Sequence, residues 1–181
     1  QAIVHSGAKP HFLYPSTRLV YKGKKGMIAE EDEKEARTVY AANKISAEQL
    51  LHLYAGYYGI IHTVFRICVP YGNLVDVPFS FGTVGFMMRQ AAQGVIQLYG
   101  EGEPRRTFTH IEDISSVFFS AIHNPKFYHE TFNIGGEDLS LKQVADLLSL
   151  KTGAEIVFKE WPPRDSLIES GDTVFDAAKL E

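Results

Sequence analysis

Apolar and polar residues along the first 72 positions predict a strand, a helix and a second strand in succession. The apolar run from His11 to Tyr14 is followed by Pro15, so we expect a buried strand that stops there. From Val39 to Tyr58 apolar residues recur at helical spacing, and Gly59 marks the end of that helix. The β-branched run His62–Ile67 predicts the next strand. Strands joined by a helix in this way are typical of an α/β fold with a parallel sheet.

After residue 72 the pattern changes to short elements separated by glycine and proline. An irregular loop is expected from Asn73 to Gly82. Ser140 is a good helix N-cap and Gly153 a good C-terminal stop, so the two residues bracket one helix. The predicted helices are residues 83–93, 112–123 and 141–152, and the predicted strands are residues 96–99, 131–134 and 155–159.

Composition narrows the class of protein. A chain of 181 residues fits one domain, or one domain with a small lobe. The 45% hydrophobic and 22% charged residues are ordinary for soluble globular proteins, and a net charge of -4 argues against nucleic-acid binding. No apolar run is long enough for a membrane span, and Gln1 to Pro10 do not resemble a signal peptide. The single cysteine, Cys68, suits a reducing compartment and a packed core position, so we expect a cytoplasmic protein.

Tyr40 and Lys44 are the first candidates for chemistry. They stand four residues apart on the expected helix, which places a phenol and an ammonium on one face. A neighbouring ammonium favours the ionised form of a phenol, as a general acid/base needs. A surface helix with an amphipathic tyrosine is the alternative interpretation of this pair alone. The seven histidines have no metal-ligand spacing, so no metal site is expected.

Ser16 and Thr17 strengthen the catalytic interpretation. They follow the first predicted strand, and ligands of open α/β sheets bind at the carboxyl ends of the strands. A hydroxyl there could share a hydrogen bond with the substrate oxygen on which Tyr40 acts.

Six segments in this order resemble the extended short-chain dehydrogenases/reductases, the NAD-dependent epimerase/dehydratase family that includes UDP-glucose 4-epimerase-like enzymes. The resemblance covers the chain from about residue 11 onward and corresponds to the C-terminal portion of the family. The segments are Phe12 to Tyr21, Tyr40 to Lys44, Arg66-Ile67-Cys68-Val69-Pro70-Tyr71-Gly72, Leu98-Tyr99-Gly100-Glu101-Gly102, Arg106-Thr107-Phe108-Thr109-His110-Ile111-Glu112-Asp113-Ile114 and Phe132-Asn133-Ile134-Gly135-Gly136.

The resemblance implies the C-terminal part of a Rossmann-type, doubly wound parallel sheet with a smaller α/β substrate-binding lobe. Residues 1–72 would hold the catalytic helix, and residues 73–181 would form mainly the lobe, with a strand and helix returning to the sheet around 106–136. The implied cofactor is NAD, with NADP as an alternative, and the implied partner is a nucleotide-diphosphate sugar. The family also implies a homodimer through the Val39–Tyr58 helix. The alternative is that this helix is buried within one chain.

The same resemblance implies roles for single residues. Tyr40 would be the acid/base, Lys44 would bind the nicotinamide ribose, and Thr17 would be the hydroxyl partner. Arg106 would bind the diphosphate, and Arg164 would add a second phosphate contact. For both arginines a surface ion pair is the alternative. The remaining implied contacts are Ser16 and Arg66 at the cofactor and Val69 and Tyr99 at the substrate.

Two absences bear on these expectations. The Gly-x-x-Gly-x-x-Gly turn that sets a pyrophosphate on a helix N-terminus does not occur here, nor does the acidic ribose contact that follows it in the family. We therefore expect part of a longer protein, with an exposed apolar sheet edge and no tight dinucleotide binding by these residues alone.

Local departures from the family pattern favour one reaction. Val69 stands where the family has an asparagine, and Arg18-Leu19 stands where 4,6-dehydratases carry an Asp-Glu pair. The glutamate of the decarboxylating relatives is missing too. What remains is 4-epimerisation by transient oxidation at C4, with an NAD(P)H-dependent keto-sugar reductase or a non-catalytic binding relative as alternatives.

Overall fold

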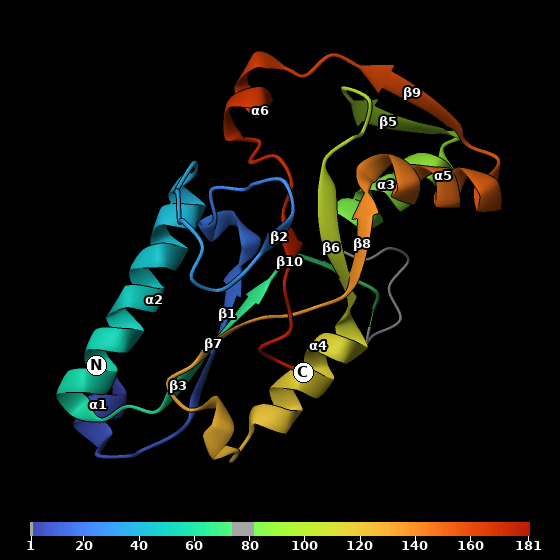
Figure 1. Cartoon of the computed structure of the whole chain (residues 1–181). Coiled ribbons are helices and arrows are strands. Elements are labelled where there is room, and N and C mark those ends of the chain that lie inside the picture. Colours follow the sequence, from blue (N-terminus) through green and yellow to red (C-terminus); the bar gives the residue numbers. More distant parts are fainter. Residues whose placement is uncertain (1, 74–81) are drawn as a thin grey trace.

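Three parallel strands organise the N-terminal part of the molecule (Figure 1). In this computed structural model, which describes residues 2–73 and 82–181, β1 (Phe12–Thr17), β3 (His62–Ile67) and β7 (Thr131–Asn133) lie in the order β1-β3-β7. Each strand reaches its neighbour through a long crossover, as parallel strands require. The expected α/β class with a parallel sheet is confirmed.

The strand β1 does not end at Pro15, so that expectation was wrong. It continues to Thr17, with Pro15 opposite Phe65 of β3. Within the described residues β1 has a neighbour on its β3 side only. A strand at the edge of a sheet tolerates a residue without an N–H group, and this explains why the proline does not break it.

Helices cover both faces of this sheet (Figure 1). On one face lies α2 (Val39–Tyr58), which begins at Thr38, whose Oγ1 accepts a hydrogen bond from the Ala41 N–H at 3.1 Å. It ends at Gly59, which adopts the left-handed conformation at φ 65°. On the other face α4 (Ile111–Ala121) packs Ile114 and its neighbours against Phe65. The predicted bounds of the Val39–Tyr58 helix are confirmed.

A second group of strands and helices follows residue 68. Strand β4 (Val69–Tyr71) pairs with β6 (Arg105–His110), and β6 pairs in the antiparallel sense with β8 (Glu137–Ser140). The parallel pair of β5 (Val95–Tyr99) and β9 (Glu155–Lys159) lies beside two helices, α3 (Gly82–Ala92) and α5 (Leu141–Thr152). The Ser140 capping box and the Gly153 stop are both present. The loop expected between Asn73 and Gly82 lies, at residues 74–81, outside the described part.

Several short elements were not predicted from the sequence. Four of them are strands that form only because segments far apart in the chain meet, as when β2 and β10 pair in parallel. A strand of two residues carries no periodic signal of its own. The unpredicted elements are α1 (Ala2–Ser6), η1 (Arg18–Val20), β2 (Met27–Ile28), η2 (Pro125–Phe127), α6 (Pro163–Ile168) and β10 (Val174–Phe175), together with β4 and β8.

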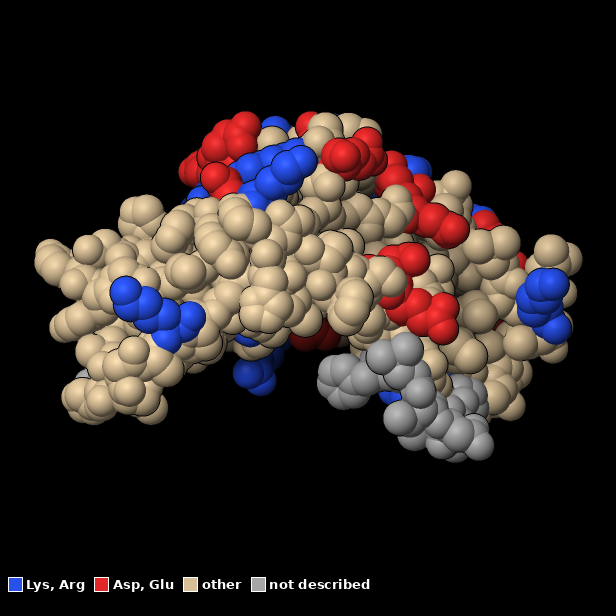
Figure 2. All heavy atoms as spheres, turned by 90° about the horizontal axis from the view of Figure 1, so that it is seen from below, with Lys and Arg blue, Asp and Glu red and all other residues tan. Residues whose placement is uncertain are grey.

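The free side of β1 is bordered by apolar grooves on both faces of the sheet. Phe12 and Tyr14 line one groove together with Tyr54 of α2, and Leu13 lines the other together with Phe118 of α4. Viewed from below, the middle of the molecular surface carries few Lys, Arg, Asp or Glu side chains (Figure 2).

Candidate active site

Tyr40 and Lys44 come together at the first turns of α2, beside the carboxyl end of β1. The Lys44 ammonium donates a hydrogen bond to the Pro15 carbonyl oxygen at 2.7 Å. Its Nζ lies 5.6 Å from the centre of the Tyr40 ring and 4.7 Å from that of the Tyr14 ring. Tyr40 is 51% exposed. The phenol is therefore accessible, while the ammonium beside it is held in place by the backbone of the sheet.

Thr17 and Ser16 occupy the end of β1 and are both buried. The Thr17 hydroxyl accepts a hydrogen bond from the Leu19 N–H at 3.3 Å and so caps the short helix η1. Ser16 donates to Oε1 of Glu48 at 2.5 Å. Thr17 is thus placed at the strand end that faces the start of α2, whereas Ser16 is tied to the middle of that helix.

Arg66 lies in a buried network under α2. Its Nη2 and Nε donate to the two carboxylate oxygens of Glu48 at 2.6 and 3.1 Å. Its Nη1 donates to the Tyr21 hydroxyl at 2.6 Å and to the Glu30 carbonyl oxygen at 2.7 Å. The arginine is only 3% exposed. Every nitrogen of the guanidinium therefore already has a partner within the chain.

Tyr21 extends this network to β7. Its hydroxyl donates to Oδ1 of Asn133 at 2.7 Å, and the Asn133 amide donates to the Ile28 carbonyl oxygen at 2.8 Å. Burial raises the pKa of Tyr21 to about 12, against the opposing effect of the Arg66 charge. Sequence reasoning missed Glu48 and Tyr21. The available signal was Arg66 itself, because a cation inside an otherwise apolar strand needs a buried carboxylate.

Arg106 is also buried, at 1% exposure. Its Nη2 pairs with Oε1 of Glu169 at 2.5 Å, and its Nη1 donates to the carbonyl oxygens of Arg105, at 2.8 Å, and Gly171. Glu169 is a second residue that the sequence did not reveal. In this arrangement Arg106 faces a carboxylate of its own chain at the point where a phosphate was expected.

The other expected substrate contacts differ in accessibility. Val69 is buried in the hydrophobic core, whereas Tyr99 is 40% exposed with its ring 5.2 Å from that of Trp161. Arg164 is exposed on α6, and no hydrogen bond or ion pair joins it to another described residue. Burial raises the pKa of the Cys68 thiol, which donates to the Thr173 carbonyl oxygen at 3.2 Å and behaves as a core residue.

Comparison with known proteins assigns the family. Residues 1–135 match the NAD dependent epimerase/dehydratase family, which covers well over half of the chain. The chain belongs to this family. The resemblance to this family is confirmed, and the Rossmann-type fold is shared with solved structures.

The names of individual relatives describe sugar-nucleotide enzymes. It is 28% identical over 138 residues to the uncharacterized UDP-glucose epimerase YtcB of Bacillus subtilis, with 76% of this chain and 43% of that protein aligned. It is 31% identical over 146 residues to the UDP-N-acetyl-alpha-D-glucosaminuronate decarboxylase of Bacillus cytotoxicus, with 76% and 44% aligned. The UDP-glucuronic acid 4-epimerase of Bacillus cereus, solved with UDP-glucuronic acid and NAD, superposes with a TM-score of 0.79 at 25% identity, over 94% of this chain and 54% of that one. The chain thus spans about half the length of these family members.

Proposed function

We propose that this chain carries the catalytic helix of an NAD-dependent nucleotide-sugar 4-epimerase. The observation that carries the proposal is the accessible Tyr40 phenol beside the anchored Lys44 ammonium, at the carboxyl end of β1. Ligands of open α/β sheets bind at that end. Membership of the epimerase/dehydratase family supports the same assignment.

The residues at this end fit one part of the cofactor. Lys44 is held against β1 and leaves two ammonium protons for a ribose, and Tyr40 lies beside it. Ser16 and Arg66 were expected at the cofactor too, but their polar groups bond Glu48, so we assign them to holding β1 and β3 under α2. NAD, when bound, supplies reversible hydride transfer, and NADP remains the alternative.

The chain's own contribution is the handling of one proton. Tyr40 as phenolate takes the proton from the C4 hydroxyl of the sugar and returns it when the opposite configuration forms. Thr17, at the end of β1, donates a hydrogen bond to the same sugar oxygen. Lys44 places a positive charge 5.6 Å from the centre of the Tyr40 ring, where it attracts the negative charge on the substrate and phenol oxygens during proton transfer.

Some of the residues expected to contact the nucleotide-diphosphate sugar are exposed, and others are already bonded within the chain. Arg164 and Tyr99 are exposed, so a phosphate and a base can reach them without rearrangement. Arg106 contacts a phosphate only after its bond to Glu169 opens. Val69 is buried in the hydrophobic core, so we assign it to packing and not to substrate contact.

A homodimer through α2 and a cytoplasmic location complete the proposal. Leu50, Leu53 and Tyr57 of α2 are 53%, 51% and 80% exposed, which supplies an apolar contact surface. Within residues 2–73 and 82–181 no helix is long and apolar enough to cross a bilayer. Sedimentation of the full-length protein tests the dimer, because a purely monomeric species at micromolar concentration contradicts it.

Product analysis of the full-length protein tests the reaction. An epimerase inverts the configuration at C4 of a UDP-hexose until the two epimers reach equilibrium, with no net consumption of NAD. Proton NMR follows the two epimers. A keto-sugar reductase instead consumes one NADPH for each keto sugar reduced. If the protein catalyses neither reaction with any nucleotide sugar, the alternative of a non-catalytic binding relative is favoured.

A further inference from the structure

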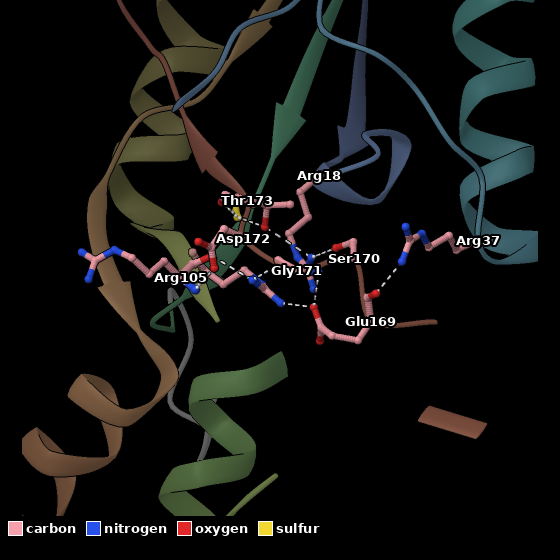
Figure 3. Close-up of polar contacts among 10 residues, drawn as sticks. Arg18, Arg37, Arg105, Glu169, Ser170, Gly171, Asp172 and Thr173 are labelled. Atoms are coloured by element: carbon pink, nitrogen blue, oxygen red, sulfur yellow. Dashed lines mark hydrogen bonds and ion pairs between the residues drawn. The ribbon is translucent and has the colours of Figure 1, made fainter. Parts of the chain in front are cut away.

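Lys44 is held in place differently from the other cations near the start of α2. Arg18 and Arg37 point toward the segment from Glu169 to Thr173 (Figure 3), and hydroxyl and carbonyl oxygens of that segment accept their hydrogen bonds. Lys44 donates one hydrogen bond, to the Pro15 carbonyl oxygen, and no ion pair joins it to a carboxylate among the described residues. One hydrogen bond does not fix the direction of a flexible lysine side chain, so a second contact is needed.

Glu48 would be the ordinary partner of Lys44, but it is already engaged. The two residues stand four positions apart on α2, the spacing at which a lysine and a glutamate meet on a helix. Both carboxylate oxygens of Glu48 accept hydrogen bonds from Arg66, and one of them also accepts a hydrogen bond from Ser16. The Lys44 charge is therefore left to its other neighbours, which are aromatic rings.

Two tyrosine rings lie beside the Lys44 ammonium. Its Nζ is 4.7 Å from the centre of the Tyr14 ring and 5.6 Å from the centre of the Tyr40 ring. A cation within about 6 Å of a ring centre is attracted by the negative face of the ring. Tyr14 is the nearer of the two and belongs to β1, as Pro15 does. The ammonium is therefore held against the sheet by a carbonyl oxygen and a ring from the same strand.

The Tyr14 ring itself is fixed by its surroundings. Phe12 and Tyr14 project from the same face of β1, and their rings stack with centres 6.4 Å apart. Both rings line the apolar groove that Ala47 and Leu51 of α2 border. The Tyr14 hydroxyl forms no hydrogen bond with another described residue, and burial, together with the charge of Glu48, raises its pKa. The ring, and not the hydroxyl, is thus the part of Tyr14 that contacts Lys44.

The contacts around Lys44 assign a role to this ring. We propose that Tyr14 is a positioning residue of the active site, whose ring face holds the Lys44 ammonium beside Tyr40. The inference rests on the proposed function, in which Lys44 binds the nicotinamide ribose and Tyr40 transfers the proton. Without the ring, Lys44 keeps only its hydrogen bond to Pro15 and occupies more side-chain rotamers, so a smaller fraction of molecules presents the ammonium to the ribose.

Release of NAD from the full-length holoenzyme measures this role without relying on turnover. An added dehydrogenase reduces the released NAD, and the absorbance of NADH follows the release. Tyr14→Leu, which removes the ring, is expected to speed the release about 3- to 10-fold, the effect of a lost cation–π contact. Tyr14→Phe, the conservative variant that keeps the ring, should rescue the release rate to within about twofold of the wild type.

Two controls separate this role from general packing. Phe12→Leu removes a ring from the same groove that makes no cation–π contact with Lys44, and it should leave NAD release unaltered. In a Lys44→Met background, Tyr14→Leu should add no further effect, because the ammonium on which the ring acts is gone. Thermal unfolding checks that each variant is folded. If Tyr14→Leu does not fold, Tyr14→Met takes its place, because an unbranched side chain adapts to an irregular groove.

Four results overturn the inference and leave the proposed function standing. Unaltered release in Tyr14→Leu removes the effect itself. Equal acceleration in Tyr14→Phe assigns it to the hydroxyl, and equal acceleration in Phe12→Leu assigns it to packing of the groove. An undiminished effect in the Lys44→Met background shows that Tyr14 does not act through Lys44. By contrast, a full-length protein that binds no NAD refutes the proposed function and the inference with it.

Discussion

The first turns of α2 and the middle of the same helix lie in opposite environments. Tyr40 and Lys44 stand at the accessible end, where the phenol is 51% exposed. Two turns after Tyr40, the Glu48 side chain is only 9% exposed and forms a bidentate ion pair with the buried Arg66. All of these residues except Glu48 belong to family motifs. We infer that a motif residue is available to a ligand only where the fold leaves some of its polar atoms without a partner.

The largest effect is expected at the accessible end. Tyr40→Phe should lower kcat about 10²- to 10⁴-fold, because it removes the proton-transferring group. The free energy of unfolding should change by less than about 0.5 kcal/mol, since the side chain is half exposed. Steady-state kinetics and urea unfolding of the full-length protein measure both quantities.

Tyr58→Phe serves as the control for that substitution. Tyr58 is on the same helix and 57% exposed, but it lies at the opposite end from Lys44. Its removal should leave kcat unchanged. A full rate in Tyr40→Phe would refute the assignment of the acid/base.

The buried end should respond in the reverse sense. Glu48→Ala should lower the free energy of unfolding by about 3–5 kcal/mol, because it leaves the Arg66 charge buried without a carboxylate. The urea midpoint measures the loss. Unchanged stability together with a weakened affinity for NAD would show instead that Arg66 contacts the cofactor. It would refute the contrast between an accessible start of α2 and a structural ion pair at its middle.

A smaller and pH-dependent effect is expected at Tyr21, which joins the network to β7. The pKa of Tyr21 is raised to about 12 in the folded protein, above about 10 in an unfolded chain. The folded state therefore binds the proton more tightly, and stability should fall as pH rises from about 10 to 12, by roughly 2–3 kcal/mol in total.

Tyr21→Phe isolates this contribution. The substitution should abolish the loss of stability that Tyr21 causes at alkaline pH. Near neutral pH it should lower the free energy of unfolding by about 1–3 kcal/mol, because Asn133 loses a hydrogen-bond donor and Arg66 loses an acceptor. Stability curves of both proteins from pH 8 to 12 measure the difference. Parallel curves would mean that Tyr21 does not titrate in this window.

The smallest effect is expected for an exposed ion pair. Lys142 and Asp146 lie four residues apart on α5 with N···O 2.8 Å, and both side chains are nearly half exposed. Lys142→Ala should change the free energy of unfolding by only about 0.3–0.5 kcal/mol. A loss as large as that of Glu48→Ala would show that burial does not explain the contrast between ion pairs in this protein.

The order of the main elements and the Tyr40–Lys44 pair could be predicted from the sequence. Helix periodicity, the Gly59 and Gly153 stops and the Ser140 cap are local signals, and the structure confirms them. The end of β1 was placed wrongly at Pro15, because its position at the sheet edge is not a local property. Short elements such as β2 and β10 depend on long-range pairing and left no pattern to recognise.

The α/β fold class, the family and the four-residue spacing that brings Tyr40 and Lys44 together follow from the amino-acid sequence alone. Which charged motif residues remain accessible depends on how distant segments pack in the folded chain. Arg66 and Arg106 are 3% and 1% exposed because Glu48 and Glu169, 18 and 63 positions away, fold onto them. The physical reason is that a helical spacing acts within one element, whereas desolvation and ion pairing depend on segments that meet only in the folded chain.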